Sequence, residues 1–139
     1  MSRVRTLREK PELPKALACG MLEDGGRVLF LIQKDRQGVE RLELPSVLVY
    51  PGQDPAALLK QAFEEQAGID AQIGDIVNES SHNAGSRKKR RFILCLVFKA
   101  HAKSGRARPS PQFSGVKWLS LEKAKEAKLG RKAEWLRKR

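Results

Sequence analysis

Cysteines, acidic residues in the second half of the chain and long apolar runs are all scarce in this sequence. Its 139 residues include two cysteines, Cys19 and Cys95, and neither has a partner at metal-ligand spacing. We therefore expect two buried thiols in a reducing compartment rather than a disulfide or a zinc site. The longest apolar run, Phe92 to Phe98, has seven residues, whereas a membrane-spanning helix needs ~18. No signal-peptide pattern follows Met1. These absences favour a cytoplasmic globular protein with no membrane partner.

The scarcity of acids makes the C-terminal part of the chain strongly basic. Residues 1–83 carry 10 basic and 13 acidic side chains, whereas residues 84–139 carry 18 basic and only 3 acidic ones. The formal net charge is +12. A concentrated positive field attracts the phosphates of nucleotides, nucleic acids or anionic lipids. A surface that only keeps the protein in solution would have the same composition.

The order of turn residues and apolar runs predicts one α/β domain. Residues 1–14 are polar and contain two prolines, so we expect an N-terminal arm, followed by a single domain over residues 15–139. The run from Phe92 to Phe98 is typical of a strand buried on both faces, and residues 45–52 are predicted to be a loop. Strands are predicted at residues 15–22, 28–33, 39–44, 71–79, 91–100 and 116–119.

A helix is predicted between the third and fourth of these strands. Asp54 has the side chain of an N-cap, Pro55 suits the first helical position, and Gly68 ends the helix. A short helix at residues 121–129 follows the last strand, and residues 131–139 are predicted to add a helical turn or two. This order of elements indicates an α/β layered sandwich with a mixed β-sheet.

The predicted helix and its flanks carry a motif. Residues 44–69 read LPSVLVYPGQDPAALLKQAFEEQAGI, which resembles the box of the Nudix (MutT-like) hydrolases, G-x5-E-x7-R-E-U-x-E-E-x-G-U with U aliphatic. Leu44-Pro45 resembles the L-P-G-G turn of that family, and residues 116–122 resemble its closing strand and capped helix. The resemblance covers residues 15–136 and implies a Nudix-like α/β/α sandwich with a mixed β-sheet.

Placing Gly68-Ile69 on the last two letters of the box assigns every other position. Glu65 then takes the first glutamate of the final pair and is the one box glutamate retained. The remaining functional positions are altered: Gln53 stands at the isolated glutamate, Gln61 at the arginine, Ala62 at the glutamate that follows it, Gln66 at the last glutamate and Val47 at the leading glycine.

The resemblance implies hydrolysis of a nucleoside diphosphate derivative with Mg²⁺ or Mn²⁺ as cofactor. These ions require several carboxylate and water oxygens, and Glu65 by itself supplies too little negative charge. Three features would add ligands: Glu64 in a frame shifted by one residue, Glu43 or Glu40 on the preceding strand, and the phosphates of the substrate. We expect Glu64, Glu43 and Glu40 to be exposed surface residues instead, and keep Glu65, then Glu43, as the metal candidates.

Other candidates for ligand contacts lie outside the box. Tyr50, in the loop before the helix, is the candidate for stacking on a base. His82 and His101 are candidate bases or phosphate contacts, although surface or strand-end positions are the simpler interpretation. Five consecutive cations in a predicted loop are candidates for phosphate or nucleic-acid contact or form a solvated hairpin tip: Arg87, Lys88, Lys89, Arg90 and Arg91.

Two functions are compatible with these residues. The shortage of carboxylates favours a catalytically impaired Nudix-fold protein that binds a nucleotide, another phosphate-containing ligand or RNA and uses no metal cofactor. The alternative is an active pyrophosphohydrolase in which Glu65, substrate phosphates and Glu43 hold Mg²⁺ or Mn²⁺. The resemblance also leaves a homodimer open.

Overall fold

Strands dominate the computed structural model, which describes residues 12–138. Residues 12–15 precede the first strand without regular structure, so most of the predicted N-terminal arm lies outside the described residues. The elements, in chain order, are β1 (Ala16–Asp24), β2 (Arg27–Lys34), β3 (Glu40–Glu43), β4 (Ser46–Val49), α1 (Pro55–Ala67), β5 (Asp70–Asn83), β6 (Phe92–Ser104), β7 (Gly115–Leu119), α2 (Leu121–Glu126) and the 3-10 helix η2 (Arg131–Lys138).

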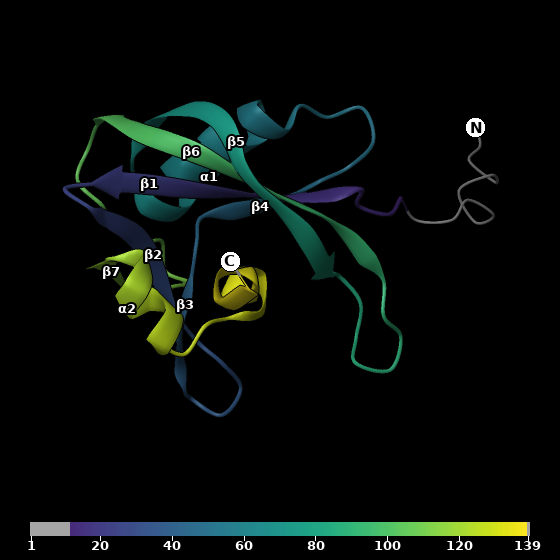
Figure 1. The fold of residues 1–139 in the computed structure, drawn as a ribbon. Coiled ribbons are helices and arrows are strands. Elements are labelled where there is room, and N and C mark those ends of the chain that lie inside the picture. Colours follow the sequence, from purple (N-terminus) through teal and green to yellow (C-terminus); the bar gives the residue numbers. More distant parts are fainter. Residues whose placement is uncertain (1–11, 139) are drawn as a thin grey trace.

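The strands form one mixed sheet, as predicted. Its main path has the order β3-β2-β1-β6-β5, with β4 also paired to β1 and β7 to β2. β1 and β6 run parallel, with Ala16 opposite Leu94, whereas the other pairs are antiparallel. β5 and β6 make the longest hairpin, and its tip projects beyond the other strands (Figure 1).

Helix α1 covers one face of the sheet because its apolar residues recur on one side. Leu59, Ala62, Phe63 and Ala67 are buried, and they pack in a cluster with residues of β1, β2, β5 and β6. Phe63 lies so close to Gly20 of β1 that a Cβ at this glycine would be 2.3 Å from the ring.

The ends of α1 have the predicted capping residues. The Asp54 side chain accepts a hydrogen bond from the Ala56 N–H at 3.1 Å. Gly68 ends the helix with a φ of 67°, in the left-handed region that favours glycine. The α1 prediction is therefore confirmed in both its extent and its caps.

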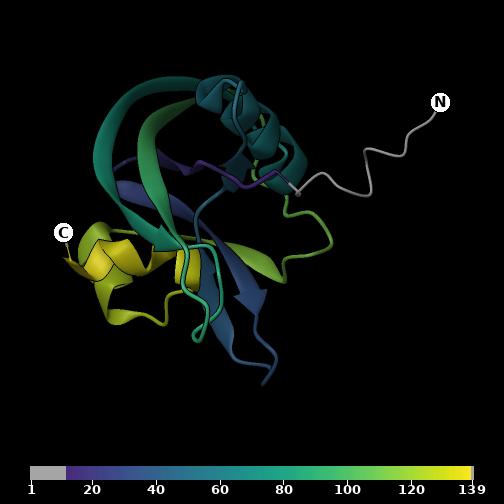
Figure 2. The same ribbon diagram turned by 90° about the vertical axis from the view of Figure 1, so that its right-hand side faces the viewer.

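The C-terminal segment covers the opposite face. Ala124 of α2 and Ala133, Trp135 and Leu136 of η2 are buried against apolar residues of β1, β2, β3 and β6. Figures 1 and 2 show α1 and η2 on opposite sides of the strands. The α/β layered sandwich predicted from the sequence is confirmed. Among residues 12–138, no helix combines the length and the apolar character needed to span a membrane.

The predictions for residues 45–52 and for the strand that begins at Phe92 were wrong in part. Residues 45–52 are not all loop, because Ser46–Val49 form β4 and pair with the start of β1. The strand from Phe92 is not buried on both faces along its whole length: Phe92 is 61% exposed and Leu94 45% exposed. Both residues lie beyond the part of the sheet that α1 covers, because Phe98 and Ala100, farther along the same strand, are in the α1 cluster.

Candidate functional site

The retained box glutamate lies on the exposed side of α1. Glu65 and Gln61 are one helical turn apart, and the Gln61 amide nitrogen donates a hydrogen bond to Glu65 Oε1 at 2.8 Å. Glu64, the acid of the shifted frame, is also exposed, as predicted, and accepts a hydrogen bond from Lys60 Nζ at 3.3 Å. Each of these carboxylates is therefore in contact with a neighbouring donor on the same helix.

Gln66 joins α1 to the start of β4. Its Nε2 donates to the Ser46 carbonyl at 2.8 Å, and its Oε1 accepts from the Ser46 N–H at 3.3 Å. An uncharged amide matches a peptide group with one donor and one acceptor, whereas a carboxylate offers acceptors only. The side chain at this box position therefore holds two elements together instead of presenting a free oxygen.

The other altered positions also have local structural roles. Ala62 is 4% exposed and packs in the α1 cluster. Gln53 Oε1 accepts a hydrogen bond from the Tyr50 N–H at 2.9 Å and so shapes the turn before α1. The Tyr50 side chain is half-buried, and its stacking on a base stays a prediction.

The residues at this face do not fit a divalent cation. A Mg²⁺ or Mn²⁺ ion requires several oxygen ligands around one point, but Glu65 is the one carboxylate at the box positions, Gln66 is engaged with Ser46, and Ala62 has no donor atom. Within residues 12–138 there is no cluster of three or more His, Cys, Asp or Glu side chains able to hold a metal.

Glu43 is buried, contrary to the prediction of an exposed strand residue. It is 9% exposed, and its carboxylate lies so close to Gly130 that a Cβ at that glycine would be 2.1 Å from Oε2. Burial raises its pKa to about 7, against the opposing effect of Lys132. Gly130 lies directly before η2 and Lys132 lies within it, so neither neighbour belongs to α1. The proposed second metal role of Glu43 stays a prediction, and these contacts do not support it.

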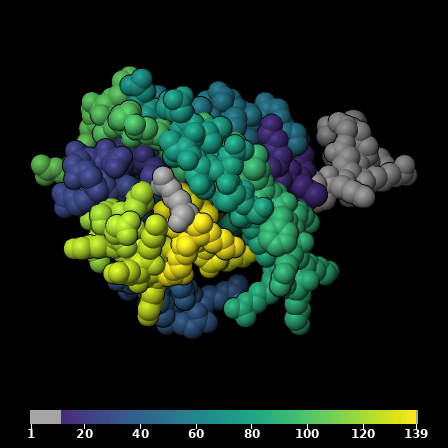
Figure 3. All heavy atoms as spheres, in the orientation of Figure 1, coloured from purple at the N-terminus to yellow at the C-terminus, as the bar shows by residue number. Residues whose placement is uncertain are grey.

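The predicted basic loop connects β5 and β6. Residues 87–91 are all exposed, and the loop projects from the body of the molecule at the lower right of the space-filling view (Figure 3). His82, near the end of β5, is partly buried, and burial followed by the positive charges of Arg131 and Lys132 lowers its pKa. His101 is exposed on β6, as predicted.

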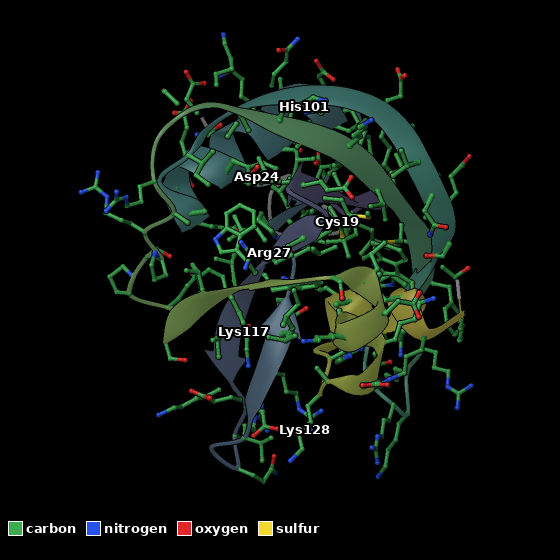
Figure 4. The ribbon with its side chains drawn as sticks, turned by 60° about the vertical axis from the view of Figure 1, so that its left-hand side comes forward. Cys19, Asp24, Arg27, His101, Lys117 and Lys128 are labelled. Atoms are coloured by element: carbon green, nitrogen blue, oxygen red, sulfur yellow. The ribbon has the colours of Figure 1, made fainter. Side chains whose placement is uncertain are left out.

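Two of the surface depressions formed by residues 12–138 lie elsewhere, and Glu65 lines neither of them. The larger, about 250 Å³, is between α1 and β5. The smaller, about 170 Å³, is bordered by Lys117 and Lys128, which lie on the outside of the fold (Figure 4).

The two cysteines lie in the interior of the fold, where Figure 4 labels Cys19. The sulfurs of Cys19 and Cys95 are 3.9 Å apart, and both thiols are buried as predicted.

Comparison with known proteins assigns this arrangement to a family. The model of the NUDIX domain matches residues 12–138, nearly the whole chain. The chain belongs to the Nudix family. No curated protein sequence matches this Nudix chain.

Solved structures share the Nudix fold at low sequence identity. The solution structure of the E. coli ORF135 protein has a TM-score of 0.67 at 18% identity, over 88% of this chain and 85% of that one. A MutT protein from Methanosarcina mazei Go1 has a TM-score of 0.62 at 22% identity, over 82% and 83%. The NUDIX domain of Shewanella oneidensis NrtR, crystallised with ADP ribose, has a TM-score of 0.61 at 12% identity, over 94% and 91%.

Sequence reasoning missed three features of this Nudix domain. Exposed Phe92 was assigned to the core because it begins an apolar run; its position directly after five cations was the available signal. Arg131 was not singled out, yet its guanidinium donates to the carbonyls of Asn83 at 2.7 Å and Gly85 at 2.8 Å. The contact between Gln66 and Ser46 joins residues 20 positions apart, and no local pattern predicts it.

Proposed function

We propose that this Nudix-domain protein binds a nucleotide or another phosphate-containing ligand, RNA included, and is impaired in metal-dependent hydrolysis. The main support for this proposal is the pair of hydrogen bonds that Gln66 makes. Its amide is bonded at both ends to the backbone of Ser46, so the position next to Glu65 serves the fold and adds no negative charge. Nudix hydrolases generally use divalent metals such as Mg²⁺ or Mn²⁺, and a single carboxylate holds such an ion weakly.

Charge supports a phosphate-containing ligand. The 15 excess positive charges of residues 84–139 create a field that attracts phosphates. The NUDIX domain of NrtR was crystallised with ADP ribose, which supports a nucleotide-type ligand for a domain of this fold. Fold alone does not determine function, so the proposal depends on the box residues and on this charge.

The competing function is an active pyrophosphohydrolase that uses Glu65 and substrate phosphates to hold Mg²⁺ or Mn²⁺. Incubating the protein with a panel of nucleoside diphosphate derivatives, with either ion or with EDTA, separates the two functions. We expect release of phosphate or nucleoside monophosphate no faster than in buffer, and the same result for Glu65→Gln. We also expect a nucleotide such as ADP-ribose, or RNA, to bind equally well with Mg²⁺ and with EDTA.

Glu64→Gln is the matched control, because Glu64 is an exposed carboxylate on the same helix. Metal-dependent turnover that is lost in Glu65→Gln and kept in Glu64→Gln would establish the enzyme and refute the impairment. Turnover lost in Glu64→Gln instead would point to the shifted frame and would also refute it. If no ligand of the panel and no RNA is retained, the binding function is wrong.

A further inference from the structure

An aromatic side chain is exposed beside the basic loop. Phe92 is the first residue of β6 and is 61% exposed, and Leu94, two residues on and therefore on the same face of the strand, is 45% exposed. A phenylalanine ring that stays in contact with water forgoes part of the free energy that its burial would contribute. An exposed aromatic ring next to a run of charges is therefore a feature that a binding partner would explain.

The loop that precedes Phe92 has a defined shape. Asn83 Oδ1 accepts hydrogen bonds from the N–H groups of Gly85 at 2.9 Å and Arg91 at 3.0 Å. Ser86 Oγ accepts from the Lys89 N–H at 2.8 Å. A Cβ at Gly85 would lie 2.1 Å from the Lys89 carbonyl oxygen, so the turn requires glycine there. The cations are thus presented by an ordered turn next to the aromatic ring.

Arg131, the first residue of η2, contacts this turn from the face of the sheet opposite α1. The Arg131 guanidinium donates to the carbonyls of Asn83 and Gly85, and its positive charge is therefore fixed beside the loop. Arg131 and Lys132 also contribute to the lowered pKa of His82, after burial. The hairpin and Arg131 together place six cations, residues 87–91 and 131, at one end of the molecule.

The loop cations have no acidic partners in the described chain. Between residues 12 and 138, the ion pairs within 4.0 Å join Arg41 to Asp35 and Lys60 to Glu64 and Asp70. None of them involves residues 87–91. Five adjacent cations without counter-charges repel one another, and this repulsion is relieved when a polyanion binds and displaces small counter-ions.

We propose that the tip of the β5–β6 hairpin binds single-stranded nucleic acid, with Phe92 stacked against a base and the loop cations against backbone phosphates. Surfaces for single strands combine a positive track with an aromatic platform, because every base has a face on which a ring can stack. An acidic protein would match the charge but not the ring. A membrane-binding segment needs a wide apolar face, and here two side chains are exposed. The proposal rests on the proposed binding of a phosphate-containing ligand. It specifies that ligand as a single-stranded nucleic acid and the binding site as the hairpin tip.

Fluorescence anisotropy with labelled oligonucleotides of about 12 nucleotides tests this site. The full chain is titrated into single-stranded RNA, single-stranded DNA, a duplex and an abasic strand of equal length, which keeps the phosphates but lacks the bases. The RNA and DNA arms identify which single strand is preferred. Phe92→Leu removes the ring but keeps an apolar side chain, and we expect it to weaken binding to the preferred strand by roughly 5- to 100-fold. Binding to the abasic strand should be weak and unchanged.

Charge is tested by a double neutralisation of the loop. We expect Lys88→Ala with Lys89→Ala to weaken binding of the single strand and to lower the slope of log K against log salt by about 1.4, since each phosphate contact contributes ~0.7 for single strands. The matched control is Lys123→Ala with Lys128→Ala, which removes two cations from the α2 region and should leave the slope unchanged. Equal effects of the two double variants would overturn the proposal.

Four further results would also overturn it: binding of Phe92→Leu equal to that of the unchanged protein, equally tight binding of the abasic strand, tighter binding of the duplex, or binding to phosphatidylserine-containing vesicles with none to oligonucleotides. Phe92 and the lysines are exposed, so all variants should keep the melting temperature of the parent. Failure here is separate from failure of the proposed function. ADP-ribose retention without oligonucleotide binding contradicts this inference, whereas metal-dependent turnover contradicts the impaired hydrolysis and leaves this surface in place.

Discussion

Replacing Glu43 by glutamine should stabilise the protein at neutral and alkaline pH and leave its stability nearly unchanged in acid. The Glu43 carboxyl group is buried beside the start of η2, and its Oε1 has no hydrogen-bond partner among residues 12–138. Burial is the largest cause of its raised pKa, and Glu134 raises it further, whereas Lys132 and Arg131 oppose the shift. Glutamine has the same shape and remains neutral, so it resembles the protonated glutamate that the fold favours.

The magnitude follows from the shift in pKa from its ordinary value of 4.5 to about 7. Because the folded-state pKa is the higher one, the contribution of the protonated group is fully present below about pH 4.5 and is lost as the pH rises to about 7. Each pKa unit corresponds to 1.36 kcal/mol, so the unchanged protein loses about 3 kcal/mol across this window. Glu43→Gln avoids that loss, which corresponds to on the order of 10 °C in Tm.

Thermal melting of both proteins between pH 4 and pH 8.5 measures this difference. We expect nearly equal Tm values near pH 4.5, a gap that widens through pH 7, and a constant gap above it. Glu40→Gln, an exposed carboxylate of the same strand, is the control and should show no such gap. A Glu43→Gln protein that is less stable than the parent at pH 8, or a difference that does not depend on pH, would refute the burial argument.

Two packing predictions concern α1. Gly20→Ala should destabilise the protein by about 1–3 kcal/mol in urea denaturation, because its Cβ would overlap the Phe63 ring. Gly115→Ala, whose Cβ would lie 3.6 Å from its nearest atom, should cost much less, and equal losses would contradict the overlap. Gln66→Ala should cost about 1–2 kcal/mol, because it removes both hydrogen bonds to Ser46. Unchanged stability of this variant would show that the amide contact does not hold α1 to β4.

The sequence predicted correctly those elements whose ends are determined by single residues. The extent of α1 follows from Asp54, Pro55 and Gly68, because capping and left-handed backbone are properties of single residues. β4 escaped prediction because a four-residue strand after Pro45 is stabilised by pairing with β1, a partner distant in sequence. Phe92 was misassigned because an apolar run shows that a strand is present but not where the covering helix ends.

For the candidate site too, the sequence predicted which residues matter but not all of their contacts. The box frame located Glu65 and the altered positions, and the charge pattern located the basic loop. What Gln66 and Glu43 contact was not predictable, since each meets a segment that only the folded chain brings near: Ser46 for Gln66, and the start of η2 for Glu43. Glu43 was expected to be exposed, because an acid in an alternating strand is normally solvated. It is buried instead.

Titration with Mn²⁺ in the absence of nucleotide measures whether the box positions of this chain can hold a divalent ion. Electron paramagnetic resonance of free Mn²⁺ during a titration counts the ions that the protein takes up. We expect weak uptake, without saturation at a fixed number of ions per protein molecule, and the same uptake by Glu65→Gln, because the box positions supply one carboxylate. Stoichiometric, tight binding that disappears in Glu65→Gln would contradict it.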